Sequence, residues 1–314
     1  MLMLKADAYG LGLEEVAKAT EDLVDGFGVV TLEEAVKLRK ICRRTPILAN
    51  YVSPNEIQTA VENGIDIGLS NDQQLEKILS LASRHCDNSK TDCKELRSKI
   101  KCSIAVDSGM HRLGFDLQDV DKVCKALKGA GVEPASIYSH FGDHYECQKE
   151  RFDTACRVTR WYLPNIKRHI ASSHQLKDAS VYYDCVRVGL SAYIGAVTVK
   201  SRVIATRQVE GGEYVGYGDY KTESRANIAV VFGGYADGID REKFVYVYAR
   251  GKRYNVIGVC MDTFIIDTQG DLLTLGEEVT LVDENTIVEQ AKTMQTIPYT
   301  LLTCWMGRTD KIYV

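Results

Sequence analysis

The chain has 314 residues, of which 45% are apolar and 26% charged, so about two globular domains are expected and a disordered or collagen-like chain is excluded. Its formal net charge of −4 provides no basic field for nucleic acid or for an anionic membrane surface. No apolar run approaches the roughly 18 residues of a membrane span, and the first residues do not form a signal peptide.

Ten cysteines are present, but no two have Cys-x-x-Cys spacing, and reduced thiols are the expected state. Five of them lie inside apolar stretches and are expected to be buried, namely Cys42, Cys102, Cys124, Cys185 and Cys260. We therefore predict a cytoplasmic protein.

The first 196 residues alternate short apolar runs with stretches of helical periodicity, such as Leu32, Ala35 and Leu38 with Glu33 and Glu34 on the other face. Eight such runs occur, at residues 1–4, 26–30, 46–50, 65–69, 100–106, 135–139, 167–171 and 185–188. Eight strands separated by helices predict an α/β fold, a (β/α)8 barrel over residues 1–196. An open doubly wound sheet is the alternative.

After about residue 197 the pattern changes to longer β-rich stretches separated by glycines. These stretches cover residues 197–209, 226–231, 243–249, 254–259, 264–267 and 278–282. Only residues 286–294 have a helical pattern there. A smaller, mostly-β domain is therefore predicted over residues 197–314.

Reactive side chains follow several of the predicted barrel strands, at the end where barrel active sites form. Lys5 follows the first strand, and Ser173 and Gly189 follow the seventh and eighth, where barrels commonly bind phosphate. A lysine after a strand is usually a surface residue, but a desolvated one can form a Schiff base. Lysine with a phosphate site suggests pyridoxal phosphate, although aldolase chemistry on a sugar phosphate would use the same parts.

Eight motifs in order resemble the alanine racemase family, the fold type III pyridoxal-phosphate enzymes. They are LKADAYGLG (4–12), DSGMHRLGF (107–115), SHF (139–141), VRVG (186–189), GEYVGYG (212–218), GYADG (234–238), GVCMD (258–262) and IPY (297–299). The resemblance implies racemisation of a small amino acid, most simply L-alanine to D-alanine for peptidoglycan precursors.

The resemblance also implies a role for each matching residue. Lys5 holds the cofactor and is one of two acid/base groups, and Tyr217 is the other, on the opposite face of the α-carbon. Tyrosine has an ordinary pKa of about 10, and the family pairs it with the residue matching His140. Arg187 faces the pyridine nitrogen and His169 hydrogen-bonds this arginine. Without the motif, Tyr217 would be interpreted as a packed tyrosine and Arg187 as a partner of Asp184 or Asp178.

Further matches concern the phosphate, the substrate and the partner subunit. The phosphate-binding residues are expected to be Tyr9, Ser173, Gly189, Leu190 and Tyr299. The substrate-binding residues are expected to be Arg112, Met261, Tyr235 and Asp262, with Arg112 and Met261 on the carboxylate. In this family Tyr217, Tyr235, Cys260, Met261 and Asp262 reach the site from the partner, so a homodimer with shared active sites is predicted.

Several positions depart from the family pattern. Ala105 stands where many members have a carbamylated lysine that supports the carboxylate-binding arginine, so a chloride ion or another residue must orient Arg112. Leu11, Ser172 and Gly216 are milder departures. The loss at residue 105 also occurs in racemases related to serine racemases, which makes serine the alternative substrate. The family's lysine lies about thirty-five residues into the chain, so an N-terminal strand and helix are expected to be missing here.

Other functional classes are weighed against a racemase. A non-catalytic pyridoxal-phosphate carrier would lack the β domain, a decayed racemase would have lost site residues, and the related decarboxylases would not match beyond the barrel. A zinc site at His140, His144 and Cys147 has suitable spacing, but His140 already has a role and the other two residues are expected in a loop before a helix that starts at Gln148. No metal is predicted.

Overall fold

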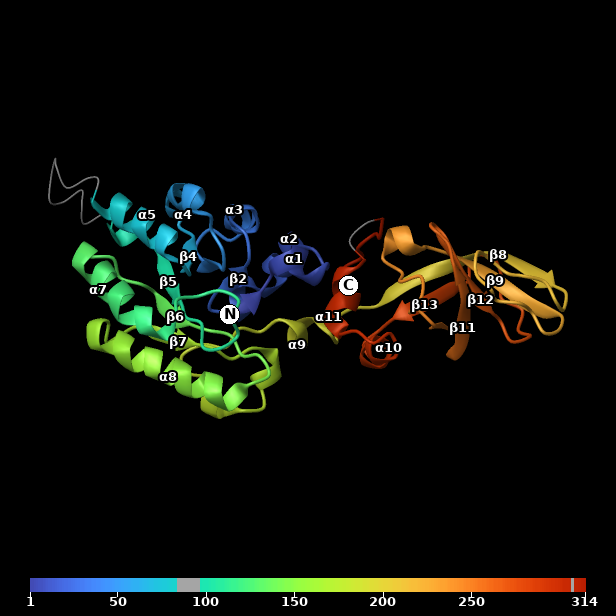
Figure 1. The fold of residues 1–314 in the computed structure, drawn as a ribbon. Coiled ribbons are helices and arrows are strands. Elements are labelled where there is room, and N and C mark those ends of the chain that lie inside the picture. Colours follow the sequence, from blue (N-terminus) through green and yellow to red (C-terminus); the bar gives the residue numbers. More distant parts are fainter. Residues whose placement is uncertain (84–96, 306–307) are drawn as a thin grey trace. The chain divides into compact units, whose positions relative to one another are not determined.

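The computed structural model describes residues 1–83, 97–305 and 308–314. The chain forms two compact units (Figure 1). The first, which we call the barrel unit, contains Met1–Ala8 and Gly12–Gly189. The second, the β unit, contains Tyr9–Leu11 and Leu190–Val314. Each unit is described by itself.

The barrel unit is built on a parallel sheet of seven strands that follow one another in chain order. The strands are β1 (Leu2–Met3), β2 (Phe27–Val29), β3 (Ile47–Ala49), β4 (Asp66–Leu69), β5 (Cys102–Ala105), β6 (Ser136–Tyr138) and β7 (Lys167–His169). Strands β1 to β6 are short and almost entirely buried, as expected for parallel strands covered by helices, whereas β7 begins with the exposed Lys167 and only His169 is buried. The predicted α/β class and the first seven strands are confirmed.

The prediction of an eighth strand at residues 185–188 is wrong. Only two isolated parallel bridges form there, Val188 with Leu2 of β1 and Arg187 with Ser172 after β7. The run is too short because Cys185 still belongs to a turn, in which its amide donates to Tyr182 O, and a helix begins at Leu190. The two bridges nevertheless connect the segment to both edges of the sheet.

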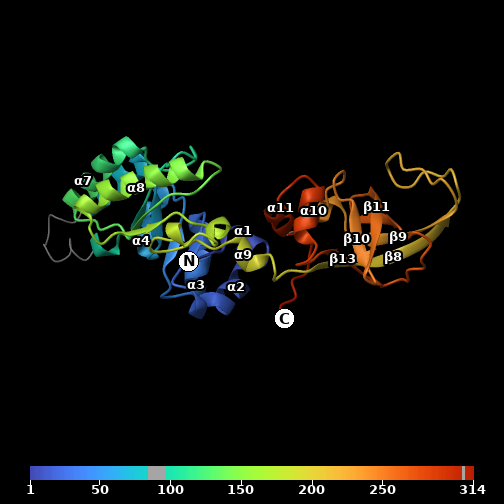
Figure 2. The ribbon, with the colours of Figure 1, turned by 90° about the horizontal axis from the view of Figure 1, so that it is seen from below.

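Helices surround this sheet (Figures 1 and 2). They are α2 (Leu13–Thr20), α3 (Leu32–Ile41), α4 (Ile57–Glu62), α5 (Asp72–Ser83), α7 (Val120–Ala130) and α8 (Tyr145–Tyr162), with 3-10 turns η1 (Glu21–Leu23), η2 (Pro54–Glu56), η3 (Leu117–Asp119), η4 (Ser173–Gln175) and η5 (Ala179–Val181). In α7 the apolar stripe containing Val120, Val123 and Leu127 is buried, and Gly131 ends the helix in the left-handed conformation. Helix α8 begins at Tyr145 instead of the predicted Gln148, so Cys147 lies on a helix and not in a loop.

The β unit contains a closed antiparallel barrel with strand order β10-β11-β12-β9-β8-β13. The strands are β8 (Val199–Val209), β9 (Ala226–Phe232), β10 (Tyr246–Ala249), β11 (Lys252–Val259), β12 (Thr263–Asp267) and β13 (Glu278–Val282). Arg250 and Gly251, both at positive φ, make a two-residue turn that pairs Ala249 with Lys252. This turn makes β11 start two residues earlier than predicted.

Three helices and one 3-10 turn accompany these strands: α9 (Leu190–Tyr193), α10 (Ile287–Thr293), α11 (Pro298–Thr303) and η6 (Tyr235–Asp237). The expectation of a single helix after residue 197 is wrong, because α11 is also present. Pro298 occupies its first turn after the extended residue Ile297, and six residues are too few to show a helical period.

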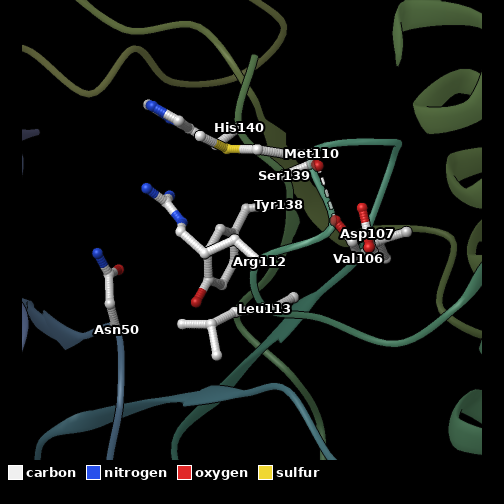
Figure 3. Close-up of a pocket in the computed structure, with 10 residues that line it drawn as sticks. Asn50, Val106, Asp107, Met110, Arg112, Leu113, Tyr138, Ser139 and His140 are labelled. Atoms are coloured by element: carbon white, nitrogen blue, oxygen red, sulfur yellow. Dashed lines mark hydrogen bonds between the residues drawn. The ribbon is translucent and has the colours of Figure 1, made fainter. Parts of the chain in front are cut away.

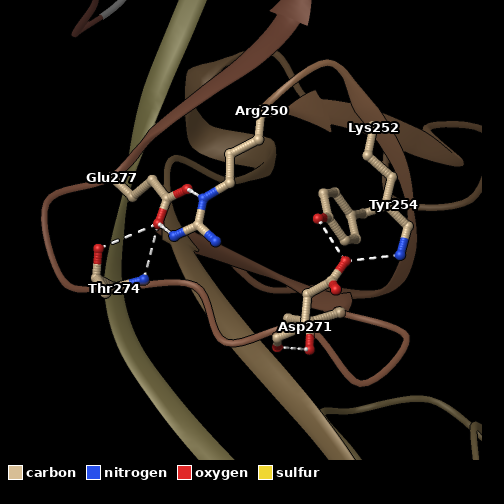
Figure 4. A network of polar contacts seen from close by, with 7 residues as sticks. Arg250, Lys252, Tyr254, Asp271, Thr274 and Glu277 are labelled. Atoms are coloured by element: carbon tan, nitrogen blue, oxygen red, sulfur yellow. Dashed lines mark hydrogen bonds and ion pairs between the residues drawn. The ribbon is translucent and has the colours of Figure 1, made fainter.

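A polar network fixes the segment between β12 and β13 (Figure 4). The Asp271 carboxylate accepts hydrogen bonds from Lys252 Nζ at 2.6 Å and from the Tyr254 hydroxyl at 2.9 Å. The Glu277 carboxylate accepts from Arg250 Nη2 at 2.7 Å and from the Thr274 amide at 2.9 Å. Both carboxylates therefore tie the segment to the turn between β10 and β11.

Eight described cysteines are free thiols, and Cys86 and Cys93 lie outside the described residues. Cys42, Cys102 and Cys124 are buried as predicted, whereas Cys185 and Cys260 are only partly buried. Within the described ranges, no helix combines the length and the apolar character needed to cross a membrane.

Candidate active site

Lys5 begins an unusual left-handed turn at the end of β1. The four residues after it, Ala6, Asp7, Ala8 and Tyr9, all have φ between 54° and 58°. Residues with a Cβ pay about 1–2 kcal/mol each for this conformation, so the surrounding contacts must hold it. No helical or strand pattern in the sequence predicts such a turn.

Two carboxylates hold the turn. Glu34 accepts hydrogen bonds from the amides of Ala6 at 2.8 Å, Val30 at 2.9 Å and Thr31 at 3.2 Å, and so connects the turn to the start of α3. Asp7 Oδ1 accepts from the Leu13 amide at 2.8 Å. Glu34 thus does more than face solvent on α3, which was the expectation for it.

The Lys5 ammonium is half-buried in a positively charged surrounding. Its pKa is lowered by burial first, then by the charges of Arg112 and Arg187, and Glu34 offsets part of this effect. A lysine with a lowered pKa supplies the neutral amine that a Schiff base requires. The expectation of a desolvated lysine is therefore met at this position.

Arg187 is buried, at 5% exposure, and its hydrogen-bond partners in the described part of the chain are all uncharged. Nη1 donates to His169 Nδ1 and, at 3.2 Å, to His169 O. Nη2 donates to the Ser139 carbonyl, to Ile170 O at 3.3 Å and to His140 Nδ1 at 3.4 Å. Burial lowers its pKa to about 10, which leaves the guanidinium protonated near neutrality. Nε takes part in none of these bonds.

The alternative partners weighed for Arg187 are occupied elsewhere. Asp184 pairs with Arg168 at 2.9 Å, and Asp178 accepts from Tyr145 and Ser180. His169 is in contact with Arg187 as the resemblance implies, and its ring stacks on Tyr138 with centroids 5.2 Å apart.

His140 is uncharged at working pH. Its pKa falls to about 3, through burial first and then through the charges of Arg187, Arg112 and Lys5. A neutral imidazole can accept or donate a hydrogen bond but cannot act as a cation. His140 can therefore offer a catalytic tyrosine a hydrogen bond but not a positive charge.

Arg112 lines a cavity of about 50 Å³ at the carboxyl ends of β3, β5 and β6 (Figure 3). The cavity is lined by Asn50, Ala105, Val106, Asp107, Met110, Arg112, Leu113, Tyr138, Ser139 and His140. The Arg112 guanidinium and the Asn50 amide project into the same space (Figure 3). Its size suits a few water molecules or a very small ligand.

Asp107 shapes the turn that presents Arg112. Its carboxylate accepts from the Gly109 amide at 2.8 Å, the His111 amide at 3.0 Å and His111 Nδ1 at 3.1 Å. Burial acts to raise the Asp107 pKa, but these donors outweigh it and the pKa is lowered. Gly109 and His111 have φ of 123° and 54°, so the Gly-Met-His segment before Arg112 is a turn.

Asn50 and Tyr138 were missed by the sequence analysis. Asn50 Oδ1 is buried and has no hydrogen-bond partner among the residues that the structure describes. The Arg187 guanidinium lies over the Tyr138 ring, with its Cζ 5.3 Å from the ring centroid. Residue 68 must be glycine beside this tyrosine, because a Cβ there would collide with the Tyr138 hydroxyl. Ala105 is buried at 3% exposure and lines the same cavity as Asn50.

The predicted phosphate residues fall into both units. In the barrel unit the Gly189 amide donates to Ser173 Oγ at 2.9 Å, which brings these two residues together. In the β unit the Tyr9 ring lies 4.8 Å from that of Tyr193 and 5.9 Å from that of Tyr299. Burial, and secondarily Tyr299, raises the Tyr9 pKa to about 12, so its hydroxyl remains a donor.

Tyr217 lies at the tip of a turn in the β unit and is 79% exposed. The turn is closed by the Val215 amide donating to Tyr220 O at 3.0 Å, and Gly216 adopts a φ of 73°. Val215 packs with Ile228 on β9 and Ile265 on β12, and these contacts anchor the turn on the antiparallel strands of the β unit. The alternative of a tyrosine packed inside the β domain is therefore wrong.

The remaining β-unit residues form one cluster. The amides of Tyr235 and Ala236 donate to Cys260 O and Met261 O at 3.1 Å, and Gly234 is required because a Cβ there would lie 2.3 Å from Cys260 O. A residue missed from the sequence, Arg308, bridges Asp237 at 2.8 Å and Asp262 at 2.7 Å. Tyr235 and Met261 are 49% and 54% exposed.

Pyridoxal phosphate fits the donors present in the barrel unit. Lys5 has a lowered pKa, Arg187 Nε is free of the bonds that hold its other nitrogens, and Ser173 lies against the Gly189 amide. Among the described residues no three His, Cys, Asp or Glu side chains lie close enough to hold a metal ion.

Comparisons with known proteins agree over the whole chain. A family model described as the alanine racemase N-terminal domain matches residues 1–197, and one described as the C-terminal domain matches residues 196–313. An alanine racemase of Clostridium kluyveri is 30% identical over 99% of this chain and 87% of its own length.

Solved structures are similar as well. An alanine racemase from Acinetobacter baumannii has a TM-score of 0.85 and 27% identity, covering 98% of this chain and 90% of that one. An alanine racemase from Bartonella henselae with covalently bound pyridoxal phosphate has a TM-score of 0.84 and 25% identity, covering 100% and 92%.

Proposed function

This chain belongs to the alanine racemase family, and we propose that Lys5 and Tyr217 exchange the α-proton of alanine between its two faces in a pyridoxal-phosphate-dependent reaction. Two observations carry the proposal together. The pKa of Lys5 is lowered by burial and by the charges of Arg112 and Arg187, and the hydrogen-bond partners of the buried Arg187 among the described residues are all neutral. The product, D-alanine, would serve peptidoglycan precursors.

Lys5 would hold the cofactor covalently, and Arg187 Nε would donate to its pyridine nitrogen. The hydroxyls of Ser173, Tyr9 and Tyr299 and the amides of Gly189 and Leu190 would bind the phosphate, because neutral donors suit a dianion at the start of a helix. When bound, the cofactor withdraws electrons from the substrate α-carbon and makes its proton acidic. Arg187 keeps its proton, so the nitrogen opposite stays an acceptor, which favours proton exchange over transamination.

Two bases are required because a single base returns the proton mostly to the face it left. Lys5 Nζ would hold the proton on one face and the Tyr217 hydroxyl on the other. His140, neutral through burial and the nearby cations, would hydrogen-bond the tyrosine. The high exposure of Tyr217 supports a role in contact with something outside its own unit.

Arg112 would bind the substrate carboxylate together with the backbone of Met261, with Tyr235 and Asp262 beside it. The small cavity lined by Arg112, Met110 and Tyr138 favours a compact side chain. Asn50 is the residue that takes the place of the missing lysine in our account, because its buried carbonyl oxygen lines the same cavity and has no partner among the described residues. Alanine is favoured over serine because the relatives compared above are alanine racemases.

We further propose a homodimer in which each site combines Lys5 of one chain with Tyr217 of the other. Three exposed side chains of the β unit, Tyr217, Tyr235 and Met261, support it, because all three stand in the motifs that reach the partner's site in this family. The free thiols support a reducing compartment, and we place the protein in the cytoplasm.

The function is tested by following the ellipticity of L- and D-alanine, and then of L- and D-serine, with the purified pyridoxal-phosphate-loaded protein. Equal end points from both alanine enantiomers, with slower turnover of serine, are expected. Turnover of serine alone would replace alanine as the substrate, and turnover of neither would refute the function.

The shared site is tested by mixing two inactive variants, Lys5→Ala and Tyr217→Phe. A mixed dimer of these chains contains one site with both native residues. After subunit exchange, activity should recover to about one quarter of the wild-type value, as expected for random pairing in a twofold dimer. No recovery, with exchange verified by mass, would show that Lys5 and Tyr217 act within one chain.

A further inference from the structure

A continuous chain of buried hydrogen bonds leads away from Arg187 through the interior of the barrel unit. Arg187 Nη1 bonds to His169 Nδ1, and His169 Nε2 lies 2.9 Å from Ser136 Oγ. Ser136 Oγ donates to Ser103 Oγ at 2.7 Å, and Ser103 Oγ donates to Asp66 Oδ2 at 2.8 Å. The chain ends there, at the first residue of β4.

The side chains of this relay come from consecutive strands. Asp66 is on β4, Ser103 on β5, Ser136 on β6 and His169 on β7, while Arg187 follows in the segment that bridges β7 and β1. Ser103 and Ser136 are directly opposite one another in the sheet register. Ser103, Ser136, His169 and Arg187 are all 6% exposed or less, so water cannot replace these bonds.

The direction of every bond follows from the chemistry of the two ends. Arginine can only donate, so His169 Nδ1 accepts and Nε2 carries the ring proton. Nε2 then donates to Ser136, whose hydroxyl donates to Ser103, whose hydroxyl donates to Asp66. A carboxylate is the acceptor that can end such a chain without needing a further partner.

Arg187 carries a buried positive charge, yet no carboxylate touches it among the described residues, and its direct partners are carbonyl oxygens and neutral imidazoles. A buried charge normally requires a compensating charge. The relay connects it to one, because polarised hydrogen bonds transmit part of the effect of a charge along the chain.

We propose that Asp66 is the remote counter-ion of Arg187 and positions its guanidinium through the Ser103–Ser136–His169 relay. Asp66 makes His169 Nδ1 a stronger acceptor, which fixes Arg187 Nη1 and aims Nε. Asp66 is a positioning residue, because it touches neither substrate nor cofactor. The effect on catalysis rests on the proposed function, while the relay itself does not.

The surroundings of Asp66 allow its charge to change near neutral pH. Oδ1 is inaccessible to solvent and has no partner in the described part of the chain, so a proton can bind there while Oδ2 still accepts from Ser103. Burial raises the Asp66 pKa to about 7, and Ser103 and Lys101 act in the opposite direction. Cys102 and Tyr138 are the other titratable groups that face it, and both stay protonated in this range because burial raises their pKa values.

The experiment compares wild type with Asp66→Asn, which keeps the shape and the acceptor but removes the charge. In the holoenzyme the wild-type kcat should exceed the variant's by about tenfold at pH 9, the size expected for weakening a bond to a charged group, and the ratio should approach one at pH 5.5. KM for alanine should stay unchanged. A ratio independent of pH would mean that Asp66 has only a structural role and would overturn the proposal.

Two further variants locate the path. Ser103→Ala interrupts the relay but keeps the carboxylate, and should lower kcat at pH 9 by the same factor, with no further loss in the double variant. Asp72→Asn is the matched control, because Asp72 is an exposed carboxylate paired with Lys122. A Ser103→Ala variant with wild-type kcat, or additive losses in the double variant, would exclude the relay.

A measurement on the cofactor-free protein tests the relay independently of the proposed racemase activity. The His169 Nε2 proton, followed by nitrogen-15 NMR, should shift with a midpoint near pH 7 in wild type, and this midpoint should be absent in Asp66→Asn and Ser103→Ala. His169 itself does not titrate there, because burial and Arg187 hold its pKa well below the usual value. The amino group of Met1 also acts on His169, and the comparison cancels it because it is common to all variants. The same midpoint in all three proteins would refute the relay, whether or not the enzyme racemises alanine.

Discussion

Glu34→Ala is the substitution whose effect on stability follows most directly from the structure. The carboxylate accepts three amide hydrogen bonds, from Ala6, Val30 and Thr31, and completes a capping box at the start of α3 with the Thr31 side chain. Alanine has a higher helix propensity than glutamate, so the loss of these bonds is the only destabilising change expected in α3.

The magnitude comes from two parts. Loss of the cap costs about 1 kcal/mol, and loss of the bond that holds the left-handed turn after Lys5 costs about 1 kcal/mol more. A total of about 2 kcal/mol in a unit of this size lowers the melting temperature by about 4–8 °C. Release of the turn should also weaken pyridoxal phosphate binding, since Lys5 begins it.

The assay is thermal unfolding by circular dichroism, with cofactor affinity measured by absorbance titration. Glu33→Ala is the matched control. It is the same substitution at the neighbouring residue, whose carboxylate pairs, among the residues with described positions, with the exposed Lys37 on the same helix. The control should melt with wild type. Equal melting temperatures for the two variants would refute the role given to Glu34.

Three other predictions concern single side chains. Asn50→Leu removes a buried acceptor without a described partner, so the free energy of unfolding should rise by about 1–3 kcal/mol while KM for alanine rises several-fold. A destabilised variant with unchanged KM would contradict this. Lys5→Met should stabilise the cofactor-free protein near neutral pH, because the lowered pKa means that the folded state disfavours the charged amine. This gain in stability, measured by thermal unfolding, should disappear as the pH rises from the lowered pKa toward 10.5, because the folded wild type has then lost the proton. The control Lys18→Met, at an exposed lysine, should show no such loss of a stability gain with rising pH. Arg308→Ala breaks the bridge between Asp237 and Asp262 and should weaken dimerisation in sedimentation experiments, with Arg250→Ala in the Figure 4 network as a control that leaves the dimer intact.

The order of the first seven strands and the positions of Lys5, Arg112 and His140 after their strands were predictable, because apolar periodicity locates the strands and parallel strands bring the residues that follow them to one end of the sheet. Arg187 was predicted at the end of an eighth strand, but it lies in a segment that makes only isolated bridges to the sheet among the described residues. The left-handed turn was not, since Ala6, Asp7 and Ala8 have no local preference for it and Glu34, 28 residues away, holds it through Ala6. The relay to Asp66 depends on sheet register, which brings together side chains more than thirty residues apart in sequence. Arg308 reaches Asp237 over 71 residues, and no local pattern reveals such a contact.

The most direct test of the account is to find which lysine carries the cofactor. The holoenzyme is reduced with borohydride, digested, and the pyridoxyl-bearing peptide identified by mass spectrometry, with Lys5→Ala as the control. We predict a single modified residue, Lys5, together with loss of alanine racemisation in the control. A modified lysine elsewhere, or unchanged racemisation in Lys5→Ala, would contradict the central claim.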